Sequence, residues 1–213
     1  MHTATTYPDT TSFWDKIAPK YARKPVKDPA AYAQKLDRVR ALLRAEDQVL
    51  EIGCGTGSTA LHLAPAVAKI IATDISRGMV EIAEGKRRAR GVTNAAFVQA
   101  DASETVYEAP FDVIMAFSLL HLVHDVPEVL DAVYAQLKPG GLLLSKTVCL
   151  GDASPVIRLF VRALGAVGLA PPVTPLSKSG LSRALVQAGF DLVECRYFGK
   201  GQLNPFIVAQ RPS

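Results

Sequence analysis

The chain has 213 residues, of which 49% are hydrophobic and 21% charged, with a net charge of +4. This composition is typical of a globular chain with a buried core, and it excludes a disordered or collagen-like protein. The sequence has no apolar stretch of the ~20 residues that a membrane span needs. The N-terminus is polar and lacks the apolar centre of a signal peptide. We therefore expect a cytoplasmic protein with no membrane span and a single domain over residues 1–213.

Charge is distributed unevenly along the chain. Residues 1–48 carry 9 Lys/Arg and 6 Asp/Glu, residues 49–150 carry 8 and 11, and residues 151–213 carry 7 and 3. An acidic centre therefore lies between two basic ends. A pI near 9.0 is compatible with nucleic-acid binding, and equally with an ordinary basic surface. The three cysteines are far apart and form no CxxC pair, so neither a disulfide framework nor a metal site is predicted.

Residues 11–44 are expected to form an N-terminal helical cap. Aromatic and aliphatic residues recur at helical spacing from Phe13 to Tyr21, and Pro19 is expected to kink or end this helix. Asp28 and Pro29 are typical of the start of a second helix. Its inward face would carry Tyr32, Leu36, Val39 and Leu43.

Strands and helices alternate after the cap. Short apolar runs predict strands over 49–52, 69–74, 95–99, 111–117, 141–149, 192–198 and 205–210. Ser76, Asp125 and Ser179 are predicted to begin the intervening helices. This alternation predicts a parallel, doubly wound α/β sheet, with a core over 49–150 and a final helix and strands over 179–213. A ligand is expected at the carboxyl ends of the strands, where the strand order reverses.

Residues 151–178 interrupt the alternation and are predicted to be a helical insertion after the fifth strand. The segment is apolar nearly all round from Ser154 onward, and prolines follow it. Arg158 and Arg162 are four residues apart and so share one helix face. We expect this insertion to act as a lid over an acceptor site. If the face with both arginines looks inward, they would pair with a carboxylate or phosphate of the acceptor. The alternative is a dimer contact with solvated arginines.

A glycine-rich loop follows the first predicted strand. Gly53, Gly55 and Gly57 allow the backbone to turn tightly and to approach a ligand closely. Asp74 ends the next strand, 21 residues after Gly53, where a carboxylate can accept both hydroxyls of a ribose. The spacing is G-x-G-x-G, with Ser58 at the position where a dinucleotide fingerprint has its third glycine.

Five segments together resemble the class I S-adenosylmethionine-dependent methyltransferases, in the order and spacing of that family. They are residues 49–58, 74–76, 99–102, 111–114 and 137–141, so the resemblance covers roughly residues 49–150. It implies a mostly parallel, seven-stranded sheet with an antiparallel last strand. It also implies S-adenosyl-L-methionine as the cofactor.

The resemblance assigns four residues to the adenosine part of the cofactor and a fifth, Tyr21, to its cover. Asp74 would bind the ribose diol, and Ile75 would pack on the adenine. Asp101 would accept a hydrogen bond from the adenine amino group, and the backbone of Ala102 would face a ring nitrogen. Tyr21 would cover the cofactor from the N-terminal helix, although a core aromatic is the alternative for this residue.

The methionine part of the cofactor would lie along the glycine loop. The resemblance implies that Gly53, Gly55 and Gly57 line it. Phe117, at the end of the fourth strand, would offer its carbonyl oxygen to the cofactor amino group. Glu51 would act near the same amine, either through another group or through a water molecule.

Methyl transfer from a sulfonium is a displacement with a neutral leaving group, so the protein supplies mainly alignment and desolvation. A general base is needed only when the acceptor arrives protonated. His121 lies just past the fourth strand and is the candidate catalytic base, with a packed core histidine as the alternative. The segment Phe117 to Leu120 has no Asn/Asp-Pro-Pro-Tyr run. This counts against an acceptor that is the amino group of a nucleobase or of glutamine.

We therefore expect methyl transfer from S-adenosylmethionine to a small acceptor that is lipophilic or aromatic, or anionic. An RNA or protein methyltransferase is the alternative within the same class. A nicotinamide-dependent oxidoreductase or a non-catalytic cofactor-binding protein is the alternative from another class. Nucleic acid is disfavoured because no aromatic residues interleave the basic run 86–90. The chain would be a monomer or a homodimer.

Overall fold

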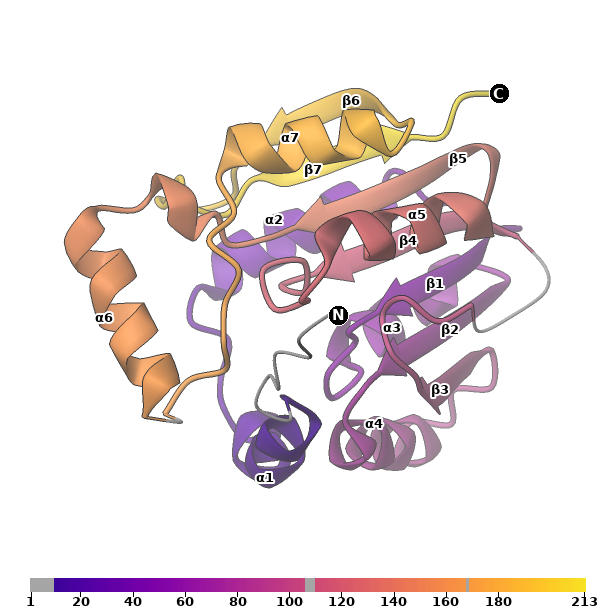
Figure 1. Cartoon of the computed structure of the whole chain (residues 1–213). Helices are drawn as coiled ribbons and strands as arrows, with labels where there is room; N and C mark the ends of the chain where they lie inside the picture. Colours follow the sequence, from indigo (N-terminus) through magenta and orange to yellow (C-terminus); the bar gives the residue numbers. More distant parts are fainter. Residues whose placement is uncertain (1–9, 106–109, 168) are drawn as a thin grey trace, which may run out of the picture.

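The computed structural model describes residues 10–105, 110–167 and 169–213. Residues 1–9, which include most of the polar N-terminus, residues 106–109 and Gly168 lie outside this description. Seven strands form one sheet in the order β3-β2-β1-β4-β5-β7-β6 (Figure 1). The strands are β1 Gln48–Ile52, β2 Lys69–Asp74, β3 Ala95–Gln99, β4 Phe111–Phe117, β5 Leu137–Lys146, β6 Asp191–Arg196 and β7 Phe206–Gln210.

The sheet is parallel from β3 to β5, and β7 runs antiparallel to both of its neighbours. The predicted mostly parallel, seven-stranded sheet with an antiparallel last strand is therefore confirmed. The strand order reverses between β1 and β4, which pair directly at the centre of the sheet. The connections from these two strands leave in opposite directions, and this opens a crevice at their carboxyl ends.

Helices cover both faces of the sheet. One core cluster joins α2 (Pro29–Arg40) and α3 (Ser58–Leu63) to the sheet, and a second joins α5 (Val126–Gln136) and α7 (Lys178–Gln187) to the opposite face. The central strands carry nearly continuous apolar runs because helices bury them on both sides. Helix α4 (Arg77–Ala89) lies beside β3 (Figure 1).

Local side-chain caps begin several of the helices. Ser76 Oγ accepts a hydrogen bond from Met79 N, and Asp125 Oδ1 accepts one from Glu128 N, so both predicted caps are confirmed. The third prediction was wrong by two residues, because Ser177 rather than Ser179 caps α7. Ser177 Oγ accepts from Gly180 N at 3.0 Å.

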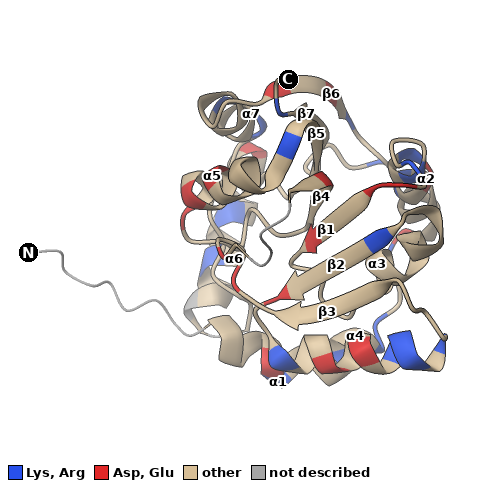
Figure 2. Ribbon diagram, turned by 90° about the vertical axis from the view of Figure 1, so that its right-hand side faces the viewer, with Lys and Arg blue, Asp and Glu red and all other residues tan. Residues whose placement is uncertain are grey.

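Helix α1 (Thr10–Ala22) continues through Pro19, so the expectation that this proline ends the helix was wrong, and the expected kink stays a prediction. Pro19 removes one helical hydrogen bond, while the packing of α1 against α4 holds the helix in place (Figure 2). Asp15 Oδ1 accepts hydrogen bonds from Ser76 Oγ at 2.6 Å and from Gly78 N at 2.9 Å. This carboxylate therefore ties α1 to the first turn of α4.

Strand β5 begins at Leu137 and ends at Lys146, whereas the sequence predicted residues 141–149. The early start requires an irregular register between β4 and β5, with a shift between Phe111 and Val113. Gly140 has a φ of 76°, which lets the chain bend there without leaving the sheet. Short 3₁₀ turns occupy Ala64–Ala66 and Leu150–Asp152.

Helix α6 (Pro155–Ala166) stands away from the sheet (Figure 1). Val156, Leu159 and Phe160 expose 77%, 71% and 64% of their surface, and Arg158 and Arg162 are also exposed. In the described part of the chain, no helix is long and apolar enough to cross a membrane.

Candidate cofactor and acceptor cavity

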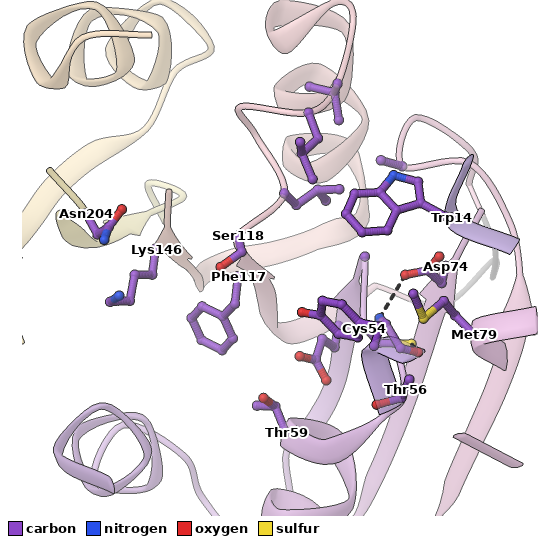
Figure 3. A pocket seen from close by; sticks show the side chains of 18 of the residues that line it. Trp14, Cys54, Thr56, Thr59, Asp74, Met79, Phe117, Ser118, Lys146 and Asn204 are labelled. Carbon is purple, nitrogen blue, oxygen red and sulfur yellow. Dashed lines mark hydrogen bonds between the residues drawn. The ribbon is translucent and has the colours of Figure 1, made fainter. Parts of the chain in front are cut away.

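A cavity of about 1200 Å³ opens at the carboxyl ends of the central strands. The glycine loop, α1, α2 and the segment after β4 contribute to its wall. Figure 3 shows Asp74, Trp14 and Met79 at one end, and Lys146 and Asn204 at the other. The predicted cofactor residues that line it are Tyr21, Glu51, Gly53, Gly55, Asp74, Ile75, Asp101, Ala102 and Phe117.

The glycine loop uses its glycines in two different ways. Gly53 lines the cavity with a φ of 67°, and a Cβ atom there would lie 2.7 Å from a methyl group of Leu119. Gly57 does not line the cavity. Its φ is 73°, and a Cβ atom there would lie 2.6 Å from the ring of Phe97. Gly57 therefore allows close packing of the loop beneath the site, and the structure places it away from a ligand in the cavity.

Asp74 lies at the end of β2 and faces the glycine loop. Its Oδ2 accepts a hydrogen bond from Gly55 N at 2.8 Å, and its Oδ1 accepts one from Ser76 N at 3.0 Å. Burial raises the pKa of Asp74, and the two backbone donors oppose this shift. Each carboxylate oxygen has a second lone pair, so Asp74 can also accept the hydroxyls of a ribose.

The neighbouring wall carries the groups predicted to meet an adenine. Ile75, Asp101 and Ala102 all line the cavity, and Asp101 Oδ1 is fixed by Ser103 N at 2.9 Å and Ser103 Oγ at 2.8 Å. Met79, on α4, also lines this end and was missed by the sequence analysis. Met79 belongs to the apolar face of its helix. Its spacing in the sequence therefore does not distinguish a residue that lines the cavity from a core residue.

Tyr21 and Trp14 cover the cavity from α1, with their rings in edge contact at 6.2 Å between centroids. Burial and the nearby charge of Asp74 raise the pKa of Tyr21. The placement agrees with the expected covering role of Tyr21, which stays a prediction.

Glu51 and Lys35 are two buried, oppositely charged side chains in the same wall. They expose 3% and 5% of their surface. Burial raises the pKa of Glu51 to about 7 and lowers the pKa of Lys35 to about 8. Among the described residues, Glu51 Oε2 has no hydrogen-bond partner. A buried carboxylate oxygen without a donor is costly, and a cationic ligand in the cavity would relieve that cost.

Lys35 was missed by the sequence analysis. Its Nζ lies 4.1 Å from the centroid of the Phe117 ring and 4.7 Å from that of Tyr32. The available signal was its position on the apolar stripe of α2, three residues after Tyr32 and four before Val39. A lysine on a buried helix face is rare unless something pairs with it.

Lys86 supports the glycine loop from α4. Its ammonium donates to Thr56 O at 3.0 Å, Thr56 Oγ1 at 2.8 Å and Ser58 Oγ at 3.3 Å. The members of the basic run 86–90 therefore have different partners: Lys86 binds the loop, whereas Arg87 and Arg88 pair with Glu84.

His121 lies outside the lining of the cavity. Its side chain is 8% exposed, and burial lowers its pKa to about 4, so the imidazole is neutral at pH 7. Its Nδ1 has no hydrogen-bond partner within the described ranges. His124 does line the cavity, and it is exposed. The catalytic assignment of His121 stays a prediction, and this geometry favours its packed alternative.

The insertion after β5 reaches the cavity through residues 172–175 and not through α6. Thr174 is held against the segment after β4, because its N–H donates to His121 O and its Oγ1 donates to Val123 O. Arg158 and Arg162 do not line the cavity. The expectation that their helix face looks inward toward an anionic acceptor was therefore wrong.

Residues 26–195 match the model of a family described as "Methyltransferase domain". The chain belongs to this methyltransferase family. It is 33% identical over 140 residues to tRNA 5-carboxymethoxyuridine methyltransferase of Escherichia coli K12, over 61% of this chain and 54% of that protein. It is 29% identical over 160 residues to malonyl-[acyl-carrier protein] O-methyltransferase of a Paenibacillus species, over 71% and 58%. The chain thus spans about half the length of the curated relatives it matches.

Solved structures show the same fold. YcgJ of Bacillus subtilis superposes with a TM-score of 0.71 at 20% identity, over 85% of this chain and 99% of that one. Magnesium protoporphyrin IX methyltransferase of Synechocystis, solved with bound SAH, superposes with a TM-score of 0.72 at 18% identity, over 96% and 98%.

These findings decide the cofactor class in favour of S-adenosylmethionine over a nicotinamide dinucleotide. The cavity fits this cofactor on two observations. Asp74 at the end of β2 offers acceptors for a ribose, and the unpartnered Glu51 Oε2 suits an ammonium group. Among the described residues no cluster of three or more potential metal ligands occurs.

Proposed function

We propose that this chain transfers the methyl group of S-adenosylmethionine to a small organic acceptor with an apolar or aromatic body. One observation carries the proposal: the cavity continues beyond the Asp74 end, past Phe117 and Ser118, to Lys146 and Asn204 (Figure 3). The wall of the cavity also includes the apolar residues Leu119, Leu122, Val123 and Phe198. It therefore offers a largely apolar space next to the one that the cofactor would fill.

The cofactor supplies an electrophilic methyl group on a sulfonium. The chain's own residues provide position and exclude water. Asp74 and the glycine loop fix the nucleoside end, and Glu51 pairs with the cofactor's ammonium. Trp14 and Tyr21 from α1 and residues 172–175 from the insertion both contribute to the wall of this space. An acceptor whose reacting atom is already deprotonated would need no base from the protein.

The proposal is tested by incubating the purified chain with methyl-tritiated S-adenosylmethionine and a fractionated bacterial extract. We expect label in solvent-extractable small molecules, and no label with the Asp74→Ala variant. Label confined to tRNA or to protein would contradict the proposal, and so would the absence of transfer to every fraction.

A tRNA acceptor is the second candidate, and it is favoured by the similarity to the E. coli tRNA 5-carboxymethoxyuridine methyltransferase. Labelling of tRNA that falls steeply between 50 and 200 mM salt would support it, because phosphate contacts release counterions.

A further inference from the structure

We propose that the far end of the cavity is a carboxylate-binding subsite formed by Lys35, Lys146 and Asn204, so that the acceptor is an organic acid. This inference rests on the proposed function and adds a substrate class to it. The subsite does not include Arg158 and Arg162 of α6, which the sequence suggested as partners of an anionic acceptor. Lys146 and Asn204 lie at the opposite end of the cavity from Asp74 (Figure 3).

Lys35 is the first component of the subsite. Its side chain is 95% buried, and its ammonium lines the cavity. Within the described residues, its only direct partners are the faces of the Phe117 and Tyr32 rings. An ammonium has three donors, and aromatic faces satisfy none of them as a hydrogen-bond acceptor would. The N–H groups of this buried ammonium can therefore donate hydrogen bonds to an anionic ligand in the cavity.

Lys146 is the second component. It is the last residue of β5, in register with Phe117 on β4 and with Phe206 on β7. Its side chain lines the cavity, and its ammonium has no hydrogen bond or ion pair to any part of the chain that the structure describes. Burial lowers the pKa of Lys146, while the charge of Asp28 opposes that shift.

The two ammonium groups repel each other, and the charge of Lys146 contributes to the lowered pKa of Lys35. An anion bound beside both would replace this repulsion by two attractions. Charge-assisted hydrogen bonds from a lysine to a carboxylate are the stronger kind in proteins. The negative charge of Glu51 stabilises the ammonium of Lys35 in the free chain. Once the cofactor's ammonium pairs with Glu51, Lys35 is available to the acceptor.

Asn204 is the third component. It lines the cavity, and its Oδ1 is buried with no hydrogen-bond partner among the described residues. Figure 3 shows its side chain beside Lys146. Rotation of the amide exchanges Oδ1 for Nδ2, which places an N–H donor at the same point. Asn204 can therefore complete a set of donors around one carboxylate.

The surroundings favour a monoanion with an apolar body. Phe117 and Phe198 line this end, and both rings pack against Phe206. Asp28 and Glu51 lie in the same wall as the lysines, and they would repel a phosphate dianion more strongly than a carboxylate. The subsite therefore suits an aromatic or aliphatic carboxylic acid.

The test compares 2-naphthoate with 2-naphthamide, and phenylacetate and decanoate with their amides, by calorimetric titration of the SAH-saturated chain. We expect at least one acid to bind more tightly than its amide. Lys35→Met and Lys146→Met should each weaken binding of that acid about ten- to a hundredfold, because each removes a charged hydrogen-bond partner. Methionine keeps the length of the side chain. Lys16→Met, at an exposed position outside the cavity, is the matched control and should bind the acid as the wild type does.

Titration with SAH comes first, so that a variant with a disrupted cavity is recognised. Equal binding of acids and amides, or acid binding that survives in both lysine variants, would overturn the subsite. Failure of every acid to bind would also overturn it. Methyl transfer to neutral small molecules only would preserve the proposed function and reject the subsite. Transfer to RNA or protein only would reject the proposed function, and the binding titration would still decide the subsite separately.

Discussion

At the scale of single residues, Asp74 combines two functions. Its carboxylate accepts hydrogen bonds from the N–H groups of Gly55 and Ser76, and it also lines the cavity, where its free lone pairs can accept further hydrogen bonds. We expect Asp74→Ala to weaken SAH binding by roughly 1.5–3 kcal/mol or more, because a charged acceptor and the order of the glycine loop are both lost. Calorimetric titration measures this change.

Asp112→Ala is the matched control for that prediction. Asp112 also accepts a backbone N–H, from Gln48 at 2.9 Å, and it pairs with Lys138 at 2.7 Å, but it lies outside the cavity lining. Its loss should lower the melting temperature and leave SAH affinity unchanged. Equal SAH affinity in the wild type and Asp74→Ala would contradict the assignment of Asp74 to the cofactor.

Glu51 gives the free chain a pH-dependent stability. Its folded-state pKa is raised to about 7, above the ordinary 4.5, so the folded state holds its proton longer than the unfolded state does. The free energy of unfolding should therefore fall as pH rises from 4.5 to 7, by up to roughly 3 kcal/mol. Urea unfolding of the ligand-free chain at pH 5.0 and 7.5 measures this loss.

Glu51→Gln keeps the shape of the side chain and removes the titration. As pH rises from 5.0 to 7.5, the unfolding free energy of the wild type should therefore fall relative to that of Glu51→Gln. A difference that stays constant across this window would show that Glu51 ionises normally in the fold.

Two substitutions at His121 separate packing from catalysis. His121→Ala leaves a cavity and should lower the melting temperature by several degrees. His121→Leu fills the space and removes an unpartnered Nδ1, so its stability should be close to that of the wild type. Both variants should retain turnover once the acceptor is known. A large loss of turnover in both, with SAH binding intact, would instead identify His121 as a base.

At the scale of elements, the carboxylate of Asp15 fixes the position of α1 over the cavity. Asp15→Ala removes the acceptor for Ser76 Oγ and Gly78 N, each bond contributing about 1 kcal/mol. We expect SAH binding several times weaker, because Trp14 and Tyr21 would cover the cofactor less often. Asp15→Asn keeps one acceptor oxygen and should restore most of the affinity. Unchanged titration curves for Asp15→Ala would show that α1 does not cover the cofactor.

The elements that the sequence predicted best are those with local signals. Ser76 and Asp125 precede amphipathic helices and cap them through side-chain bonds three residues away. Pro19 and Ser179 misled the prediction, because tertiary contacts keep α1 helical and because Ser177 offers a competing cap. The start of β5 could not be predicted, since it depends on an irregular register with a distant strand.

At the scale of the whole molecule, the sequence predicted residues that gather at the Asp74 end of the cavity, and it did not predict the lysines at the other end. Residues such as Asp74 and Phe117 follow strands, and a parallel sheet gathers strand ends at one edge. Lys35 comes from a helix before the sheet, and Lys146 ends β5, which the sequence predicted to continue to residue 149. Their burial and proximity arise only when α2 packs on the sheet, so no spacing in the sequence encodes them.

Helix α6 carries several exposed apolar side chains in the described part of the chain, and this sets the last prediction. Val156, Leu159 and Phe160 lie at positions i, i+3 and i+4, so they form one exposed stripe. Because the stripe is exposed and lies outside the cavity lining, Leu159→Glu with Phe160→Glu should change unfolding free energy by no more than about 0.5 kcal/mol. SAH affinity should be unchanged. Sedimentation velocity should show less self-association than in the wild type, since the two charges oppose burial of the stripe against a second copy. A large loss of stability or SAH affinity would show instead that α6 folds back onto the chain as a lid.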